Sequence, residues 1–235
     1  MGKTIATGFA EAGAHVVPVS HRAELVQQMV AHIEGLGRKS LAVPTDVVSR
    51  EQLSSLVDRV VERFGRVDIL VNSAGAHIKV PTLDMKEEEW DRIMNINLKG
   101  LFFACQRFGR QMVKQKKGKI INIASIGSFV SLHEVSAYCV SKAGVAELTK
   151  CLACEWAPYN VNVNAIAPGV FRTPLNAKVL DIPERLEKLI SHTPMKRLGK
   201  LEELVGAAIF LATEASDYVT GETILVDGGF IACGI

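Results

Sequence analysis

The sequence predicts an α/β protein, a single domain in which helices cover both faces of a parallel sheet and make three layers. Strand-like and helical segments alternate along the whole chain, which is the order typical of this class. The strands are nearly continuous runs of Val, Ile and Leu, as expected for strands that are buried on both faces. No linker or change in composition divides the 235 residues, so residues 1–235 are expected to form one domain.

The first segments begin this alternation. Ile5, Phe9 and Ala12 have the spacing of one helical face, and Gly13 is expected to end that helix. The segment "HVVPV" (15–19) then predicts a strand. The pattern continues as a helix, a strand and a helix over residues 23–36, 40–45 and 49–64. Ser49 is the expected N-cap of the last of these helices, and Gly37 and Gly65 the expected ends of the two helices.

The remaining elements follow the same order. Strands are expected at residues 67–72, 118–125, 161–168 and 222–229, and helices at 86–116, 136–156 and 201–213, with a polar helical excursion at 174–192. An open parallel sheet binds its ligand beyond the C-terminal ends of its strands. The chemistry is therefore expected at Ser20, Asp46, Asn72, Ser125 and Pro168–Gly169.

Composition and charge exclude several classes of protein. The net charge is +2, and the densest basic run, "KQKKGK" (114–119), is expected to be a solvated helix end rather than a nucleic-acid site. No apolar run reaches the length of about 18 residues that spans a membrane, and no signal-peptide pattern is present. The five cysteines follow no framework spacing, which indicates reduced thiols in a cytoplasmic protein. "CLAC" (151–154) is expected to be buried helix packing, and no metal site is predicted.

The segment "SAYCVSK" (136–142) contains a chemically suggestive pair. Tyr138 and Lys142 are four residues apart, so they share one face of a helix. An ammonium group beside a phenol stabilises the phenolate, and the pKa of Tyr138 is therefore expected to fall. Such a phenol can exchange a proton with a carbinol or carbonyl oxygen. Ser125 ends the strand before this helix, and Asn97 lies within the long helical segment, in "NINLKG" (95–100).

Six segments, in order along the chain, resemble the successive motifs of the short-chain dehydrogenase/reductase family. They are "NSAG" (72–75), "NINLKG" (95–100), "NIAS" (122–125), "YCVSK" (138–142), "VNVNAIAPG" (161–169) and "GETILVDGG" (221–229). The resemblance implies a Rossmann-type doubly wound parallel sheet, a nicotinamide cofactor and a catalytic set of Asn97, Ser125, Tyr138 and Lys142. It further implies that the enzyme transfers a hydride between nicotinamide and a carbonyl or secondary alcohol.

Within that resemblance each catalytic residue has an implied role. Tyr138 is the general acid/base, and Lys142 lowers its pKa and holds the nicotinamide ribose. Ser125 donates a hydrogen bond to the substrate oxygen, and Asn97 holds a water that continues the proton path. One position departs from the family pattern, because Ser73 stands where a second asparagine is usual. A hydroxyl replaces only part of the hydrogen bonding of an amide, so the cofactor pocket is expected to be slightly looser.

The resemblance also implies the cofactor contacts. Asp46 and Val47 border the adenine, Asn72, Ala74 and Gly75 the ribose, and Pro168, Gly169, Val170 and Thr173 the carboxamide end of nicotinamide, together with Tyr138 and Lys142. At the end of the strand 15–19, where an acid would bind the ribose 2′-hydroxyl of NAD, the chain has Ser20, followed by His21 and Arg22. These residues would attract a 2′-phosphate, so NADP(H) is favoured and NAD(H) remains possible.

The opening residues raise a further expectation. The family fold begins with a central strand and a turn of pattern T-G-x-x-x-G-x-G, and Gly2 matches the last glycine of that turn. The first strand and most of the turn are therefore expected to be absent, about 10–20 residues by strand and motif length. The chain is expected to be a shortened form of a longer active enzyme. The alternative is that the short chain is real and impaired. As a function of another class, a non-catalytic subunit that assembles with intact homologues is also kept.

The substrate is less closely defined. The later segments look most like the gluconate 5-dehydrogenase branch, which favours a sugar acid or polyol, and rather like 3-oxoacyl-carrier-protein reductases, the alternative. Residues 171–195 are expected to form a lid over the substrate. The candidate cations for a substrate carboxylate are His77, Lys79, His133 and Arg172. The apolar segment that ends the chain, "TGETILVDGGFIACGI" (220–235), predicts a homotetramer, because an exposed apolar edge strand would otherwise aggregate.

Overall fold

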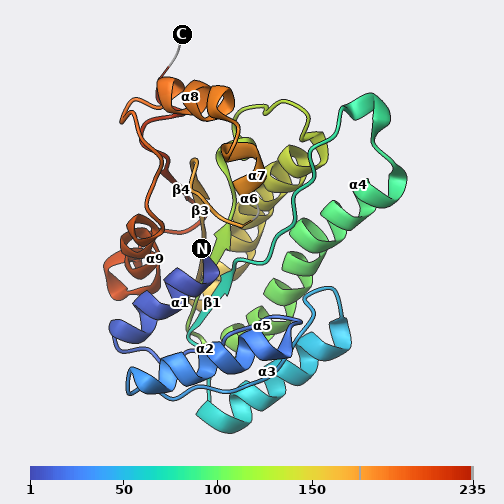
Figure 1. Cartoon of the computed structure of the whole chain (residues 1–235). Helices are drawn as coiled ribbons and strands as arrows, with labels where there is room; N and C mark the ends of the chain where they lie inside the picture. Colours follow the sequence, from blue (N-terminus) through green and yellow to red (C-terminus); the bar gives the residue numbers. More distant parts are fainter. Residues whose placement is uncertain (175, 234–235) are drawn as a thin grey trace.

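The centre of the molecule is a parallel sheet of four strands. The computed structural model describes residues 1–174 and 176–233, and its strands lie in the order β1 (Ile69–Asn72), β2 (Gly118–Ile123), β3 (Val161–Pro168) and β4 (Thr223–Val226). Figure 1 shows helices on both sides of this sheet, so the predicted three-layer α/β architecture is confirmed.

The helices follow the predicted alternation. They are α1 (Gly2–Glu11), α2 (Ala23–Gly35), α3 (Arg50–Phe64), α4 (Glu87–Met94), α5 (Leu101–Gln115), α6 (Ser136–Trp156), α7 (Ala177–Leu180), α8 (Pro183–His192) and α9 (Val205–Ala212). Helix α3 begins and ends as predicted. The Ser49 side chain accepts a hydrogen bond from the Gln52 amide, and Gly65 ends the helix with φ 78°.

Alternating side chains of the buried strands divide the core in two. In β3, Val161, Val163, Ala165 and Ala167 face the cluster built with α5 and α6. Ile166 faces the opposite cluster, which Ile5 and Phe9 of α1, Leu211 of α9 and Leu204 just before α9 complete. This two-residue period places one helical layer on each face of the sheet.

The predicted strands at residues 15–19 and 40–45 are not formed. The two segments run side by side, joined by Val16 N–Lys39 O (3.3 Å) and Thr45 N–Ser20 O (2.8 Å), but neither joins the sheet. Between residues 14–20 and β1 lies a cavity of about 830 Å³ with a mainly apolar lining. In the described part of the chain neither segment has a ladder with β1, and the two backbone bonds between the segments are too few and too far apart along the chain to define strands.

The long predicted helix at residues 86–116 is divided. A π-helix over Asn95–Gly100 separates α4 from α5, and such wide turns occur frequently at functional sites. The predicted excursion at residues 174–192 is also divided, into α7 and α8, and Pro183 occupies the first turn of α8. Leu175 of that excursion lies outside the described residues. The predicted helix at 201–213 begins as the 3₁₀ turn Leu201–Leu204 before α9.

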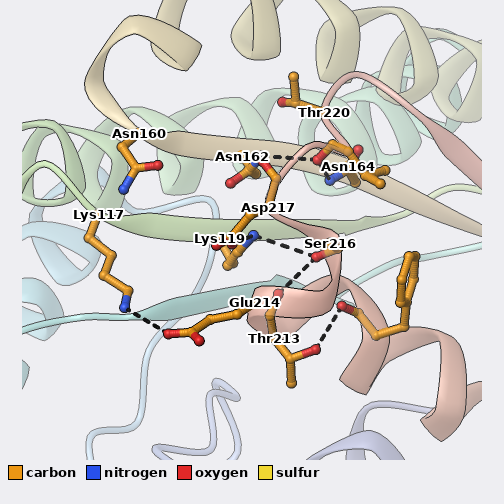
Figure 2. A network of polar contacts seen from close by, with 12 residues as sticks. Lys117, Lys119, Asn160, Asn162, Asn164, Thr213, Glu214, Ser216, Asp217 and Thr220 are labelled. Atoms are coloured by element: carbon orange, nitrogen blue, oxygen red, sulfur yellow. Dashed lines mark hydrogen bonds and ion pairs between the residues drawn. The ribbon is translucent and has the colours of Figure 1, made fainter.

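A polar network joins the amino ends of β2 and β3 to the turn at residues 213–221 (Figure 2). The ammonium group of Lys119 donates to Asp217 (2.7 Å) and to Ser216 (3.5 Å). The Asn162 amide donates to the carbonyls of Asp217 and Val219. The prediction that residues 114–119 form a solvated helix end is therefore wrong for Lys119, which is buried and paired. The network holds the 213–221 turn at the opposite end of the strands from the candidate site.

The cysteines do not follow the predicted burial. Cys105 is buried, whereas Cys151 and Cys154 are exposed and only Leu152 and Ala153 between them are buried. The prediction that "CLAC" packs in the interior is therefore wrong for both thiols, because they lie on the outward face of α6. In residues 1–174 and 176–233, no helix combines the length and apolar character that crossing a membrane requires.

Candidate active site

Three predicted catalytic side chains meet at the carboxyl end of β2. Tyr138 and Lys142 lie one turn apart on α6, and the Lys142 ammonium group is 5.9 Å from the centre of the Tyr138 ring. Ser125 follows β2 and is buried. Its hydroxyl oxygen accepts a hydrogen bond from the Gly127 amide (3.0 Å), which leaves the hydroxyl proton available for a second partner. The parallel strand and α6 thus bring together residues that lie 17 positions apart at most.

Lys142 is a buried cation. Its ammonium group donates to the Ile123 carbonyl (2.6 Å), and in the described part of the chain no carboxylate pairs with it. Burial lowers the pKa of Lys142 to about 8. An ammonium group that keeps donors free at the floor of a site suits a ligand that offers hydroxyl acceptors. The residues present therefore fit the ribose of a nicotinamide nucleotide.

The expected lowering of the Tyr138 pKa is wrong for this geometry. Burial raises the pKa of Tyr138, and a hydrogen bond with the Ser125 side chain lowers it by less than burial raises it. The Lys142 ammonium group points at the Ile123 carbonyl rather than at the phenol. Removing the charged phenolate from water is the dominant effect at this position.

Asn97 does not present its amide to the site. Its side-chain oxygen accepts from the Ala76 amide (2.7 Å), and its nitrogen donates to the Ala76 carbonyl (2.9 Å) and the Ser141 hydroxyl (3.0 Å). Both protons of the amide nitrogen are therefore used. The side-chain donors of Asn97 are therefore engaged with protein groups, and the expectation that Asn97 holds a water stays a prediction.

Five of the residues predicted to contact the cofactor line the large cavity. Its lining includes Gly2, Ser20, Val47, Asn72 and Ala74. A Cβ atom at Gly2 would lie 3.1 Å from the Ser73 hydroxyl oxygen. Ser73, the residue that departs from the family pattern, therefore lies directly against the start of α1. The Asn72 amide turns inward and donates to Asn122 (2.9 Å) and Cys105 (3.2 Å). Of the other predicted contacts, His21 and Arg22 are exposed and Asp46 accepts from the Val48 amide.

The predicted nicotinamide end follows β3. Gly169 donates its amide to the Val226 carbonyl (2.9 Å), and a side chain there would meet the Asp227 backbone at 2.6 Å, so only glycine fits. The Val170 carbonyl accepts from the Gly199 amide, and the Thr173 amide and hydroxyl both donate to Asn176. Gly75 lies near Lys142. A Cβ atom at this position would be 3.9 Å from the Lys142 ammonium group. Gly75 therefore borders Lys142, whereas the loop after Pro168 is held by β4, Gly199 and Asn176.

The four candidate cations have different surroundings. Lys79 forms an ion pair with Glu134, and Arg172 pairs with Asp181 (2.6 Å). His133 lies 3.5 Å from the same Glu134 carboxylate. His77 is half-buried, and its ring meets the Tyr138 ring edge-on at 5.2 Å between centres. Burial, and to a smaller extent the charge of Lys79, lower the pKa of His77.

The sequence reasoning missed several polar residues around the site. Ser141 donates to the Tyr138 carbonyl (2.7 Å), Ser128 donates to the Lys142 carbonyl (2.7 Å), and Glu134 adopts φ 64° while it pairs with Lys79. Ser141 was visible inside "YCVSK", one position before Lys142. Its place in the sequence indicates no role, because the contact between Ser141 and Asn97 is seen only in the folded chain.

Comparisons with known proteins show the family of this chain. The family model "Enoyl-(Acyl carrier protein) reductase" matches residues 1–231. A 2-dehydro-3-deoxy-D-gluconate 5-dehydrogenase of Dickeya dadantii is 41% identical over 99% of this chain and 91% of its own length. An NAD-dependent glycerol dehydrogenase of Listeria innocua is 40% identical over 98% of this chain and 89% of its own length.

A solved structure is also similar along almost the whole chain. The gluconate 5-dehydrogenase of Burkholderia cenocepacia, in complex with NADP and tartrate, is 36% identical with a TM-score of 0.95, over 98% of this chain and 91% of that one. The buried Ser125–Tyr138–Lys142 arrangement, the six motifs in order and these similarities lead to one assignment. The chain belongs to the short-chain dehydrogenase/reductase family, the NAD(P)-dependent oxidoreductases that it resembles along its whole length.

Proposed function

We propose that this protein interconverts a carbonyl and a secondary alcohol on a sugar acid or polyol, with Ser125, Tyr138 and Lys142 as its catalytic residues. The observation that carries the proposal is the buried Lys142 ammonium group beside Tyr138, with no carboxylate partner among the described residues. The experiment that tests it is a screen of NADP and NAD reduction with gluconate, related sugar acids, glycerol and other polyols. An absence of hydride transfer to every substrate by the folded protein would contradict it.

Each residue has a defined task in the proposed reaction. The nicotinamide, when bound, supplies or accepts the hydride. Tyr138 gives its phenolic proton to the substrate oxygen in reduction and takes it back in oxidation. Ser125, whose oxygen is held by the Gly127 amide, donates its hydroxyl proton to the same substrate oxygen as charge develops there. Lys142 holds the ribose hydroxyls, and its positive charge favours the phenolate when Tyr138 has lost its proton.

Two observations support a sugar acid or polyol as the substrate. Relatives named for 2-dehydro-3-deoxy-D-gluconate and for glycerol are 41% and 40% identical to this chain. His77 lies at the Tyr138 ring and, unlike Lys79 and Arg172, forms no ion pair in the described part of the chain; burial lowers its pKa and favours the neutral imidazole, which can hydrogen-bond with substrate hydroxyl groups. A relative from Thermotoga maritima named 3-oxoacyl-[acyl-carrier-protein] reductase is 39% identical, so a 3-oxoacyl thioester belongs in the substrate screen as the alternative.

The cofactor preference gives a direct prediction. We propose NADP(H), because Ser20 ends its segment without an acid, with Arg22 two residues later. The Ser20→Asp variant places a negative charge where a 2′-phosphate would lie. The preference should shift toward NAD(H) by about 1–3 kcal/mol, roughly 5- to 150-fold in the ratio of kcat/KM values.

The measurement is kcat/KM with each cofactor for the parent and the Ser20→Asp variant. Ser55→Asp adds the same charge at an exposed position on α3 and serves as the control. A parent that already prefers NAD(H) by about tenfold or more would show that Ser20 and Arg22 do not select a 2′-phosphate.

We also propose that the protein is a homotetramer. Strand β4 lies at the edge of the sheet, and its Leu225 is 40% exposed. An uncovered apolar edge favours pairing with a second copy. Light scattering at micromolar concentration should give four times the 25.5 kDa mass of the chain, with a dimer as the second expectation. A single 25.5 kDa species would contradict the proposal.

The alternative role, a non-catalytic subunit that assembles with intact homologues, makes a different prediction for cofactor binding. Titration of the protein with NADPH should enhance the cofactor's fluorescence and saturate if the chain is an enzyme. A folded protein, as judged by circular dichroism, that leaves the fluorescence unchanged would support the alternative.

A further inference from the structure

A closed ring of contacts surrounds the Tyr138 side chain. The Ser141 hydroxyl donates to the Tyr138 carbonyl at 2.7 Å, and the Asn97 amide donates to the Ser141 oxygen at 3.0 Å. The Asn97 side chain in turn accepts from the Ala76 amide (2.7 Å) and donates to the Ala76 carbonyl (2.9 Å). The next residue, His77, places its ring against the Tyr138 ring at an interplanar angle of 70°. The ring thus starts at the Tyr138 backbone and returns to the Tyr138 side chain.

Burial makes this arrangement rigid. Asn97 and Ser141 are fully buried, and Ala76 is buried as well. The side-chain polar atoms of Asn97 and the Ser141 hydroxyl are all paired, and breaking one link leaves a buried group unsatisfied, at a cost of about 1–3 kcal/mol. Asn97 lies within the π-helix, whose wide turn separates it from the regular helical face of α4 and α5. The loop after β1 and the first turn of α6 are therefore fixed relative to each other.

We propose that Ser141 and His77 are positioning residues, which hold the Tyr138 ring at the reacting carbon through this ring of contacts. The proposal rests on the proposed function, because it gives Tyr138 the proton transfer. Ser141 fixes the backbone that carries Tyr138, and His77 restrains the ring from the side. A displacement of about 1 Å at a reacting group can cost about 10²-fold in rate, so loss of this restraint should lower the rate measurably.

The same helix provides a matched control. Two turns further along α6, the Thr149 hydroxyl donates to the Val145 carbonyl (2.8 Å) and accepts from the Asn122 amide (2.9 Å). Thr149 is as completely buried as Ser141, and it likewise joins a buried asparagine to a backbone carbonyl of its own helix. It lies outside the ring around Tyr138. Ser141→Ala and Thr149→Val should therefore cost similar stability, whereas only the first should affect Tyr138.

The kinetic experiment compares these two variants in the whole chain. Ser141→Ala should lower kcat by about tenfold or more while the KM for cofactor changes by less than about twofold. Thr149→Val should keep kcat within about twofold of the parent at the same loss of melting temperature. Equal losses of kcat in both variants would overturn the proposal, because destabilisation alone would then account for them. If Ser141→Ala does not fold, Ser141→Cys keeps the volume and a weak donor and should show smaller changes in the same direction.

A spectroscopic readout separates this proposal from the proposed function. The chain has three tyrosines, and Tyr159 and Tyr218 are exposed, so a ¹³C label at the tyrosine Cζ should give Tyr138 a distinct resonance. Burial raises the pKa of Tyr138, which a hydrogen bond with Ser125 lowers and Cys139 raises; Lys142 on α6 and His77 after β1 also face the ring. Ser141→Ala should shift this resonance and lower its titration midpoint, because a loosened ring admits water. Thr149→Val should leave both unchanged.

His77 is tested by its conservative replacement. His77→Phe keeps an aromatic edge against Tyr138 and should preserve the Tyr138 resonance, whereas His77→Ala should shift it as Ser141→Ala does. A Tyr138 resonance that is unmoved in both Ser141→Ala and His77→Ala would overturn the positioning roles, even if the parent is active. A parent that transfers no hydride would overturn the proposed function, while the resonance would still decide whether the ring of contacts restrains Tyr138.

Discussion

Replacing Tyr138 with Phe is expected to lower kcat by about 10²–10⁴-fold with little change in cofactor affinity. The variant removes the phenolic proton and keeps the aromatic ring against His77. Ser125 and Lys142 remain in place, so any residual rate would report the contribution of the hydrogen bond from Ser125 and of cofactor positioning. The measurement is steady-state turnover on the best substrate of the screen, with cofactor affinity measured separately.

The matched control is Tyr159→Phe. Tyr159 follows α6 in a 3₁₀ turn and is 45% exposed, so the same chemical change there should leave turnover unchanged. A Tyr138→Phe variant that keeps more than about a tenth of the parent rate would show that another group supplies the proton.

Filling the large cavity with a strand is expected to stabilise the protein and strengthen cofactor binding. The cavity separates residues 14–20 from β1, and the β1 residues Ile69–Asn72 are only half-buried, although β2 and β3 are buried throughout. An apolar strand with a glycine turn, fused ahead of Met1, would lie at the start of α1, which borders this cavity. It could pair with β1 on one side and with residues 15–19 on the other.

The expected gain in stability is the difference between burying the side chains of the added strand and ordering its backbone. Each buried aliphatic side chain of the added strand contributes about 1.5–3 kcal/mol, and ordering its backbone costs about 1–2 kcal/mol per residue. A net gain of a few kcal/mol should raise the melting temperature by about 5–10 °C for a chain of this size. The amide groups at the start of α1 would also face the pyrophosphate with glycines in front of them, so NADPH should bind more tightly.

The experiment measures melting temperature and NADPH affinity for the 235-residue chain and the fused form side by side. A fusion of equal length made of Gly, Ser and Asp cannot fill an apolar cavity and serves as the control. Equal affinity and equal melting temperature in all three proteins would show that the chain holds its sheet and the cofactor phosphates by other contacts.

The sequence by itself determined the layers and most elements of this protein. Continuous apolar strands such as "GKIINI" predicted a parallel sheet buried on both faces, and β3 and α6 lie at the predicted residues. Ser49 and Gly65 located the ends of α3. These features are local, because strand composition, capping side chains and glycines with positive φ act within a few residues of chain.

Only the tertiary structure decided what depends on distant partners. Residues 15–19 and 40–45 have strand composition but form no strand, because a strand needs a neighbour that pairs with its backbone. The sequence could not show that Asn97 would use both amide protons on Ala76 and Ser141, or that burial would outweigh the Ser125 hydrogen bond and raise the pKa of Tyr138. Desolvation and hydrogen-bond saturation depend on every group that surrounds a side chain, and those groups come from segments far apart in the sequence.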